Sequence, residues 1–187
     1  MKVILNFAFS IFLFSSLYCM NKSQNDHEIF HLIKERNRYG TSILQREGNL
    51  GKIRSFIAEN KGLLKKVDYL DNTPLQVASG LGDVELVEYL LQSGADPNKG
   101  NTDINSTPLF QVIISYSIWK SLNSPECYSV TDADKSDFEN RLIITYNRLL
   151  NYGADENRKL FDKTPREWDN MYGDWRGKFF QVFYRMK

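Results

Sequence analysis

The chain has 187 residues, 42% of them hydrophobic, and a formal net charge of +1. This length suits one domain, and the composition is that of an ordinary globular protein. Basic and acidic residues are nearly balanced, at 24 and 23, and no basic cluster occurs. These features argue against a nucleic-acid-binding surface.

Residues 1–19 differ in character from the rest of the chain. Lys2 precedes an apolar run at 3–14, and a more polar boundary ends at Cys19. This order predicts a signal peptide at 1–19, and the run is too short for a comfortable membrane span. We therefore expect an exported protein, periplasmic or secreted and of bacterial type, with no stable membrane span in the mature chain. Only Cys127 would then remain, so no internal disulfide is expected.

Two alternatives to signal cleavage stay open. One is a lipoprotein anchored through Cys19, although Tyr18 is bulky for such a signal and Leu17 lies one place too close to the cysteine. The other is an uncleaved anchor. The lipoprotein would make the chain a lipid-anchored structural protein of the envelope.

A polar segment and a helix are predicted for residues 20–39. Asp26 can cap the helix, and apolar residues follow at helical spacing. These are Ile29, Phe30, Leu32 and Ile33. We expect this helix to cover one end of the domain.

The same helix carries the pattern HExxH at His27, Glu28 and His31. Two histidines one helical turn apart can hold zinc, and the glutamate can act as a general base. The alternative function is therefore a zinc metalloprotease. The sequence around the HExxH pattern does not favour that function. Too few residues precede the pattern, and neither Glu35 nor Glu47 stands in a sequence context typical of a third zinc ligand. We expect no metal, no cofactor and no catalytic residue.

Residues 71–98 predict two short helices joined by a tight turn. The first helix begins at Thr73-Pro74, because threonine caps free N–H groups and proline suits the first helical position. Gly80 and Gly82 end it. Helices this short need neighbours to be stable.

The second helix is expected at about 84–92. Asp83 can cap its start, and Gly94 supplies a left-handed stop after its end. Its expected apolar face consists of Val84, Val87, Leu90 and Leu91.

Several of these motifs recur. Thr-Pro stands at 73–74, 107–108 and 164–165, and Gly-Ala-Asp stands at 94–96 and 153–155. Gly48-Asn49-Leu50 matches Gly82-Asp83-Val84, and this step has the same length as the first step between the Thr-Pro motifs. A period of about 33 residues with a Thr-Pro-Leu helix start is typical of ankyrin repeats.

Residues 71–98 resemble one ankyrin repeat almost from end to end. The resemblance implies an all-α ankyrin-repeat solenoid of about four helix-turn-helix units, the terminal ones degenerate. We expect an ankyrin-repeat domain at 40–187, with repeats at about 40–70, 71–104 and 105–162 and a cap at 163–187. The first repeat would turn at Gly48-Asn49-Leu50 before a helix that carries Ile53, Phe56 and Ile57.

The third repeat is longer than the second. Thr107 and Gly153 lie more than twice as far apart in the sequence as the equivalent pair Thr73 and Gly94. We expect an insertion at 123–139, polar in its second part, with the second helix resuming at Asn140. It is either a functional loop or a surface insertion without a role. The aromatic residues of the cap are expected to pack within it rather than form an exposed patch.

The resemblance implies a protein-protein interaction module, because ankyrin repeats bind proteins through their loop tips and the exposed side of each first helix. The partner would be another protein, and the expected role of this chain outside the cytoplasm is that of an immunity, inhibitor or envelope-support protein. The corresponding partner-binding residues are Tyr69, Leu70, Asn72, Leu81, Asp103, Ile104, Ser106 and Ile114.

Overall fold

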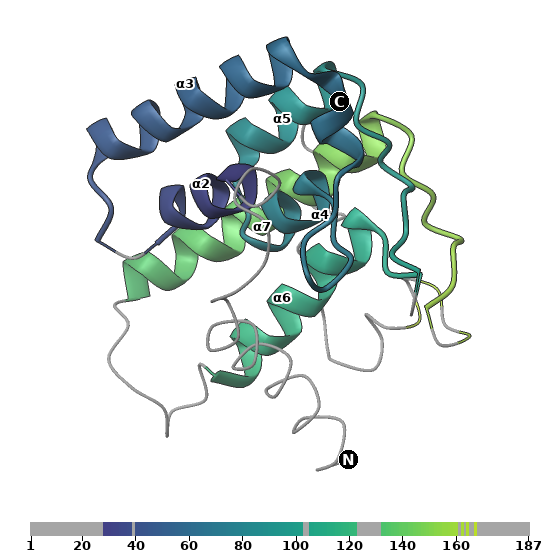
Figure 1. Cartoon of the computed structure of the whole chain (residues 1–187). Coiled ribbons are helices and arrows are strands. Elements are labelled where there is room, and N and C mark those ends of the chain that lie inside the picture. The colour runs from purple at the N-terminus through teal and green to yellow at the C-terminus, as the bar shows by residue number, and fades with distance from the viewer. Residues whose placement is uncertain are drawn as a thin grey trace.

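The computed structural model describes residues 28–38, 40–102, 105–122 and 132–160, with residues 162, 164 and 167. These residues form six α-helices and one 3-10 helix, in agreement with the predicted all-α class (Figure 1). The elements are α2 (Glu28–Arg36), α3 (Ile43–Glu59), η1 (Lys61–Lys65), α4 (Pro74–Gly80), α5 (Val84–Gln92), α6 (Pro108–Leu122) and α7 (Asp132–Asn151). The predicted signal peptide, His27, and nearly all of the predicted cap lie outside the described residues.

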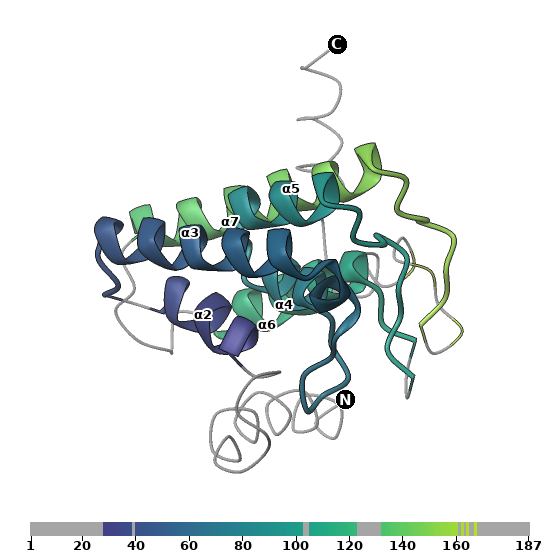
Figure 2. The same ribbon diagram turned by 45° about the horizontal axis from the view of Figure 1, so that its top comes forward.

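The helices pack in consecutive pairs, α2 with α3, α4 with α5 and α6 with α7. Helices α2, α4 and α6 also pack in sequence against one another, and we call them the inner row. Figure 2 shows α3, α5 and α7 side by side along the opposite side of the molecule, and we call them the outer row. The apolar core lies between the two rows. Among the described helices, none has the length and apolarity that crossing a membrane requires.

Helices α4 and α5 form as the sequence predicts. The Thr73 hydroxyl accepts the Gln76 N–H at 3.3 Å, and the Gln76 side chain accepts the Thr73 N–H at 2.6 Å. Gly82 makes the turn with a φ of 61°. Asp83 then caps α5 by accepting the Leu86 N–H at 3.2 Å. The buried face of α5 differs in one position from the expected one, since Leu86 is buried and Val84 is only half-buried.

The turn expected at Gly48-Asn49-Leu50 is not formed, because α3 runs through it as one helix. The helix is capped earlier, where the Ser42 hydroxyl accepts the Gln45 N–H at 3.2 Å. A separate inner helix before Gly48 would have no face to bury, since Ile43 and Leu44 are 80% and 86% exposed. Helix α2 takes that place instead, since it packs against both α3 and α4.

Helix α7 begins at Asp132, well before the predicted start at Asn140. The last part of the predicted insertion at 123–139 is therefore helical. Its polar residues include Asp137, which is exposed and pairs with Arg141 one turn later at 3.0 Å. Phe138 packs against the core and meets Trp119 of α6 edge to face, with ring centroids 5.2 Å apart. The sequence did not predict this part of the helix, because Phe138 is its one large apolar residue and the neighbouring residues are mostly polar.

Three loops have a residue in left-handed backbone two positions before a threonine. These residues are Asp71, Asn105 and Asp162, with φ of 60°, 54° and 61°. The threonines are Thr73, Thr107 and Thr164 of the three Thr-Pro motifs. Thr164 repeats the capping contacts of Thr73, because it exchanges hydrogen bonds with Glu167. We call the first two of these loops, 66–72 and 96–105, the first and second loop tips.

Candidate protein-interaction surface

Asp68 organises the first loop tip. Its buried carboxylate accepts the Leu70 and Asn72 N–H groups, both at 3.0 Å. Its own N–H donates to the Asn72 carbonyl at 2.9 Å, and its carbonyl accepts the Asp71 N–H at 2.9 Å. These hydrogen bonds close the tip into a turn.

The first loop tip displays apolar side chains to solvent. Tyr69 is 41% exposed, as expected, and Leu70 is half-buried. Val67 is 40% exposed and was not predicted. Val67 and Tyr69 stand on either side of the buried Asp68 in the sequence, and both side chains are exposed. The order of apolar, acidic and aromatic residues around Asp68 was the sequence signal that could have indicated the exposure of Val67.

Lys34 of α2 approaches the same tip. Its ammonium lies 5.2 Å from the centre of the Tyr69 ring and 3.6 Å from Asp68 Oδ2. A cation over an aromatic face is attracted by the ring, and an exposed contact of this kind contributes about 0.5–1 kcal/mol. Lys34 therefore helps to orient Tyr69 beside the inner row.

Asn72 joins the first tip to α6. Its side-chain carbonyl accepts from Gln111 Nε2 at 3.2 Å. The same Gln111 nitrogen donates to the Ser106 hydroxyl at 3.2 Å. Asn72 is half-buried, so its amide is both a surface group and a connection between units.

Ser106 lies in the interior, contrary to its predicted place at a surface tip. It is fully buried, and its N–H donates to Asn101 Oδ1 at 3.0 Å. Its carbonyl accepts from Gln76 Nε2 of α4. Ser106 is buried because it ties the second tip to α4, so it is not a contact residue for a partner.

The remaining predicted contact residues are Leu81, Ile114, Asp103 and Ile104. Leu81, at the end of α4, and Ile114, on α6, are half-buried and pack against the core while keeping part of their surface on the inner row. Asp103 and Ile104 lie outside the described residues. Helices α4 and α6 approach closely, since a Cβ at Gly80 would lie 3.2 Å from Ser115 Oγ.

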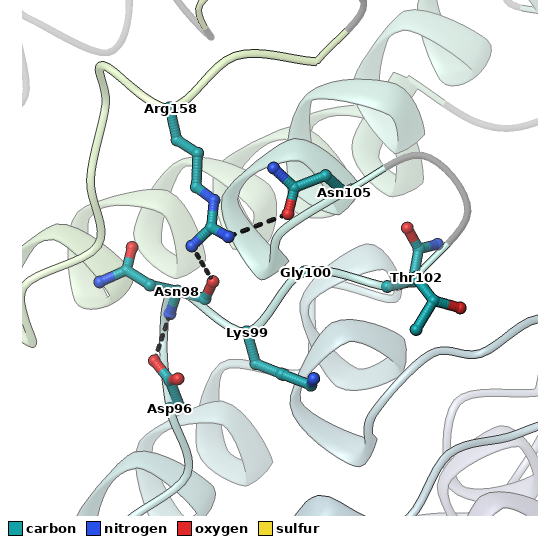
Figure 3. Close-up of a pocket in the computed structure, with 8 residues that line it drawn as sticks. Asp96, Asn98, Lys99, Gly100, Thr102, Asn105 and Arg158 are labelled. Atoms are coloured by element: carbon teal, nitrogen blue, oxygen red, sulfur yellow. Dashed lines mark hydrogen bonds between the residues drawn. The ribbon is translucent and has the colours of Figure 1, made fainter.

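The second loop tip is joined to the loop after α7. The Asn98 side chain donates to the Gly153 carbonyl at 2.8 Å and accepts the Asp155 N–H at 2.7 Å. Arg158 donates to the Asn98 carbonyl at 2.6 Å and to Asn105 Oδ1 at 2.9 Å (Figure 3). These contacts border an open pocket of about 430 Å³. Sequence reasoning missed this pocket, although the repeated Gly-Ala-Asp motif marked two of its loops.

The two loop tips are also joined to each other. Asp71 Oδ2 accepts from the Thr102 hydroxyl and from the Thr102 N–H. These hydrogen bonds, that of the side chain first, lower the pKa of Asp71 below its ordinary value, and the charge of Lys99 acts in the same direction. The first and second tips therefore form one continuous edge.

The HExxH pattern is only partly within the described residues. Glu28 and His31 are exposed on α2, and His27 lies outside. Among the described residues, no three His, Cys, Asp or Glu side chains are placed to share a metal ion. The absence of a metal site in the whole chain stays a prediction.

A comparison with known protein families finds a match that includes parts of both loop tips. Residues 70–102 match the family model of the ankyrin repeat. The match contains α4, α5, most of the second loop tip and the end of the first. It coincides with the helices whose caps and turns agree most closely with the sequence-based prediction.

Proposed function

Because this chain is an ankyrin-repeat protein by its residues 70–102, we propose that it is a non-catalytic module that binds another protein. Ankyrin repeats are protein-protein interaction modules, so this function follows from the family. The proposed architecture is an ankyrin solenoid in which α2/α3, α4/α5 and α6/α7 are successive units. A further unit would start at Thr164, which is supported by the capping contacts with Glu167 and the left-handed Asp162 before it.

The proposed partner surface is the first loop tip with the neighbouring part of the inner row. Its members are Val67, Tyr69, Leu70, Asn72, Leu81 and Ile114, with Asp103 and Ile104 as further candidates. The observation that carries the proposal is the exposure of Val67 and Tyr69 on a tip that Asp68 holds in place. A tyrosine on a preordered loop loses little conformational freedom on binding, and such residues are frequent anchors of interfaces.

A matched pair of tyrosines tests this surface. Tyr69 is 41% exposed on the first tip, and Tyr152 is 39% exposed after α7, where it donates to Glu88 of the outer row. The partner is first captured from the native organism with the wild-type chain and purified, and its affinity for each variant is then measured by calorimetry. We expect Tyr69→Ala to weaken binding about tenfold or more, and Tyr152→Ala to leave it unchanged. Equal affinities for the two variants would exclude the first tip.

We also propose that the chain acts outside the cytoplasm, as residues 1–19 predict. Mass spectrometry of the protein from its own organism would test this directly. A mature chain that begins at Met20 supports export with cleavage. An acylated Cys19 would instead support the lipid-anchored alternative, and an intact Met1 on protein found in the cytoplasm would contradict export.

A further inference from the structure

The pocket between the second loop tip and the loop after α7 has an unusual lining. Among the residues that the structure describes, its lining consists of Asp96, Asn98, Lys99, Gly100, Asn101, Thr102, Asn105 and Arg158, and each of these side chains is polar or charged (Figure 3). The pocket therefore suits a polar group of a ligand.

The described lining side chains have more basic than acidic groups, and the nearby Asp71 carboxylate, which the charge of Lys99 also affects, already accepts two hydrogen bonds from Thr102. Two of the lining side chains are basic, Lys99 and Arg158, and one is acidic, Asp96. Asp96 Oδ1 is already engaged by the Asn98 N–H at 2.8 Å. Among the described residues, no carboxylate lies within ion-pair distance of Lys99 or Arg158.

Arg158 is held in position for such a group. Two of its guanidinium nitrogens donate to neutral oxygens, the Asn98 carbonyl and Asn105 Oδ1. A guanidinium has five N–H donors, so several remain for a ligand. Figure 3 shows the Arg158 side chain descending between these two residues, whereas the Lys99 side chain points away from Arg158 on the other side of the backbone.

Gly100 lets Asn105 approach the backbone of the second loop tip closely. A Cβ at this position would collide with Asn105 Oδ1 and lie 3.1 Å from the Asn105 backbone. A side chain here would displace the acceptor that orients Arg158. Asn105 itself lies in left-handed backbone, with a φ of 54°, which asparagine tolerates better than most residues.

We propose that this pocket receives an acidic segment of the partner protein, with a carboxylate bound at Arg158 and further negative charge beside Lys99. The proposal rests on the proposed function and adds the chemistry of the partner. Charge-assisted hydrogen bonds from a preordered arginine give such a contact direction, and the exposed lysine adds electrostatic attraction.

The test uses the whole chain, labelled with ¹⁵N, and a short end-blocked peptide of alternating glutamate and glycine as the probe. Its control is the same peptide with glutamine in place of glutamate. We expect the acidic peptide, and not the neutral one, to shift the NMR signals of the Asn98–Thr102 amides and of Arg158 Nε. Equal shifts with both peptides, or none with either, would overturn the proposal. Inorganic phosphate in a third titration must bind more weakly than the acidic peptide, since tighter phosphate binding would contradict a carboxylate site.

Two lysine variants separate this pocket from general charge attraction. Lys99→Gln removes a pocket charge, and Lys52→Gln removes a charge from α3 that is also exposed. We expect Lys99→Gln to weaken the acidic peptide about threefold, in the range of an exposed ion pair, and Lys52→Gln to have no effect. Equal losses in the two variants would contradict a specific site. Arg158→Gln should lose more than Lys99→Gln, and Lys99→Gln remains informative if the loop of Arg158 rearranges.

The outcome is distinct from that of the Tyr69 experiment. If Tyr69→Ala weakens the partner and the acidic peptide produces no shifts, the interaction function stands and the acidic-segment proposal fails. If the peptide binds in the pocket and Tyr69→Ala has no effect, the pocket stands and the first tip is not the partner's contact.

Discussion

Thr73 and Thr145 are both almost fully buried, but their hydroxyl groups have different surroundings. The Thr73 hydroxyl caps α4 by accepting the Gln76 N–H. Among the described residues, Thr145 Oγ1 on α7 is one of the few buried polar atoms without a hydrogen-bond partner. The same side chain therefore stabilises the fold at one position and leaves an unmet polar group at the other.

Replacing each threonine with valine should change stability in opposite directions. We expect Thr73→Val to lower the free energy of unfolding by about 1 kcal/mol, because the helix loses its cap. Thr145→Val keeps the shape and removes the unpaired hydroxyl, so it should be neutral or raise the free energy of unfolding by up to about 1 kcal/mol. Urea unfolding followed by circular dichroism measures both changes. A loss of similar size in both variants would contradict this assignment.

The edge formed by the loop tips should respond to acid through Asp71. Hydrogen bonds from Thr102 lower the pKa of this carboxyl in the folded chain. Its contribution to stability is therefore present above its pKa in the unfolded chain and is lost as pH falls through the lower pKa of the folded state. In Thr102→Val the side-chain donor is gone, so the pKa of Asp71 should move back up. NMR titration of the Asp71 carboxyl measures this, and an unchanged pKa would contradict the contact.

At the scale of elements, helices could be predicted where every signal is local. Thr73 caps the start of α4, Gly82 makes the turn, Asp83 caps the start of α5, and Gly94 follows its end in left-handed backbone. All four residues lie within one short segment. Helices α3 and α7 were predicted less well, because their extent depends on which residues find a buried surface. Gly48 resembles Gly82 in its sequence context but lies inside a helix, where nothing turns the chain.

Alanine at these two glycines distinguishes a helix from a turn. A Cβ at Gly48 meets nothing within 4 Å, and the backbone there is helical. Gly48→Ala should therefore raise the free energy of unfolding by about 0.5–1 kcal/mol. At Gly82 the φ of 61° disfavours alanine and a Cβ would lie 3.3 Å from Leu142 Cδ2, so Gly82→Ala should destabilise the protein by more than about 1 kcal/mol. Destabilisation by Gly48→Ala in thermal melts would instead support a turn.

At the scale of the whole molecule, Arg36 connects the first helix pair to the second. Its guanidinium lies 2.8 Å from Asp83 Oδ2 and 2.7 Å from Glu85 Oε2, and it also donates to the Arg46 carbonyl of α3. Burial lowers the pKa of Arg36, but Asp83 and Glu85 outweigh that effect, so its pKa is raised and the charge is retained. The sequence identified Asp83 as a cap but not this pairing, because the two residues lie 47 positions apart.

Breaking this contact should be costly, because it leaves a buried Asp83 carboxylate without its cation. We expect Arg36→Met to lower the free energy of unfolding by about 3–5 kcal/mol. Arg54→Met is the matched control, since Arg54 pairs with the same Glu85 at 3.3 Å but is about half-exposed. It should cost less than about 1 kcal/mol. Equal losses in denaturant titrations would show that burial does not decide the strength of these pairs.

As with the helices, the sequence predicted those parts of the candidate surface that depend on local signals and not those that depend on contacts between units. Tyr69 could be identified because its place on a loop tip follows from the register of one repeat. Ser106 was misplaced and Arg158 was missed because their positions depend on partners in other units. Ser106 binds Gln76 of α4, and Arg158 reaches Asn98 and Asn105 in a loop far earlier in the chain.

The left-handed residues Asp71, Asn105 and Asp162 have a consequence for protein engineering. Each stands two places before a threonine, although the second step between them is much longer than the first. A left-handed residue two places before the threonine is thus a local feature that the three loops share, whatever the length of the helices between them. A combinatorial library could diversify Val67, Tyr69 and Leu70 while Asp68, Asp71 and Thr73 are kept. Such a library would vary the side chains of the first loop tip while the residues that close the tip and cap α4 are kept, so it separates positions open to change from positions that stabilise the fold.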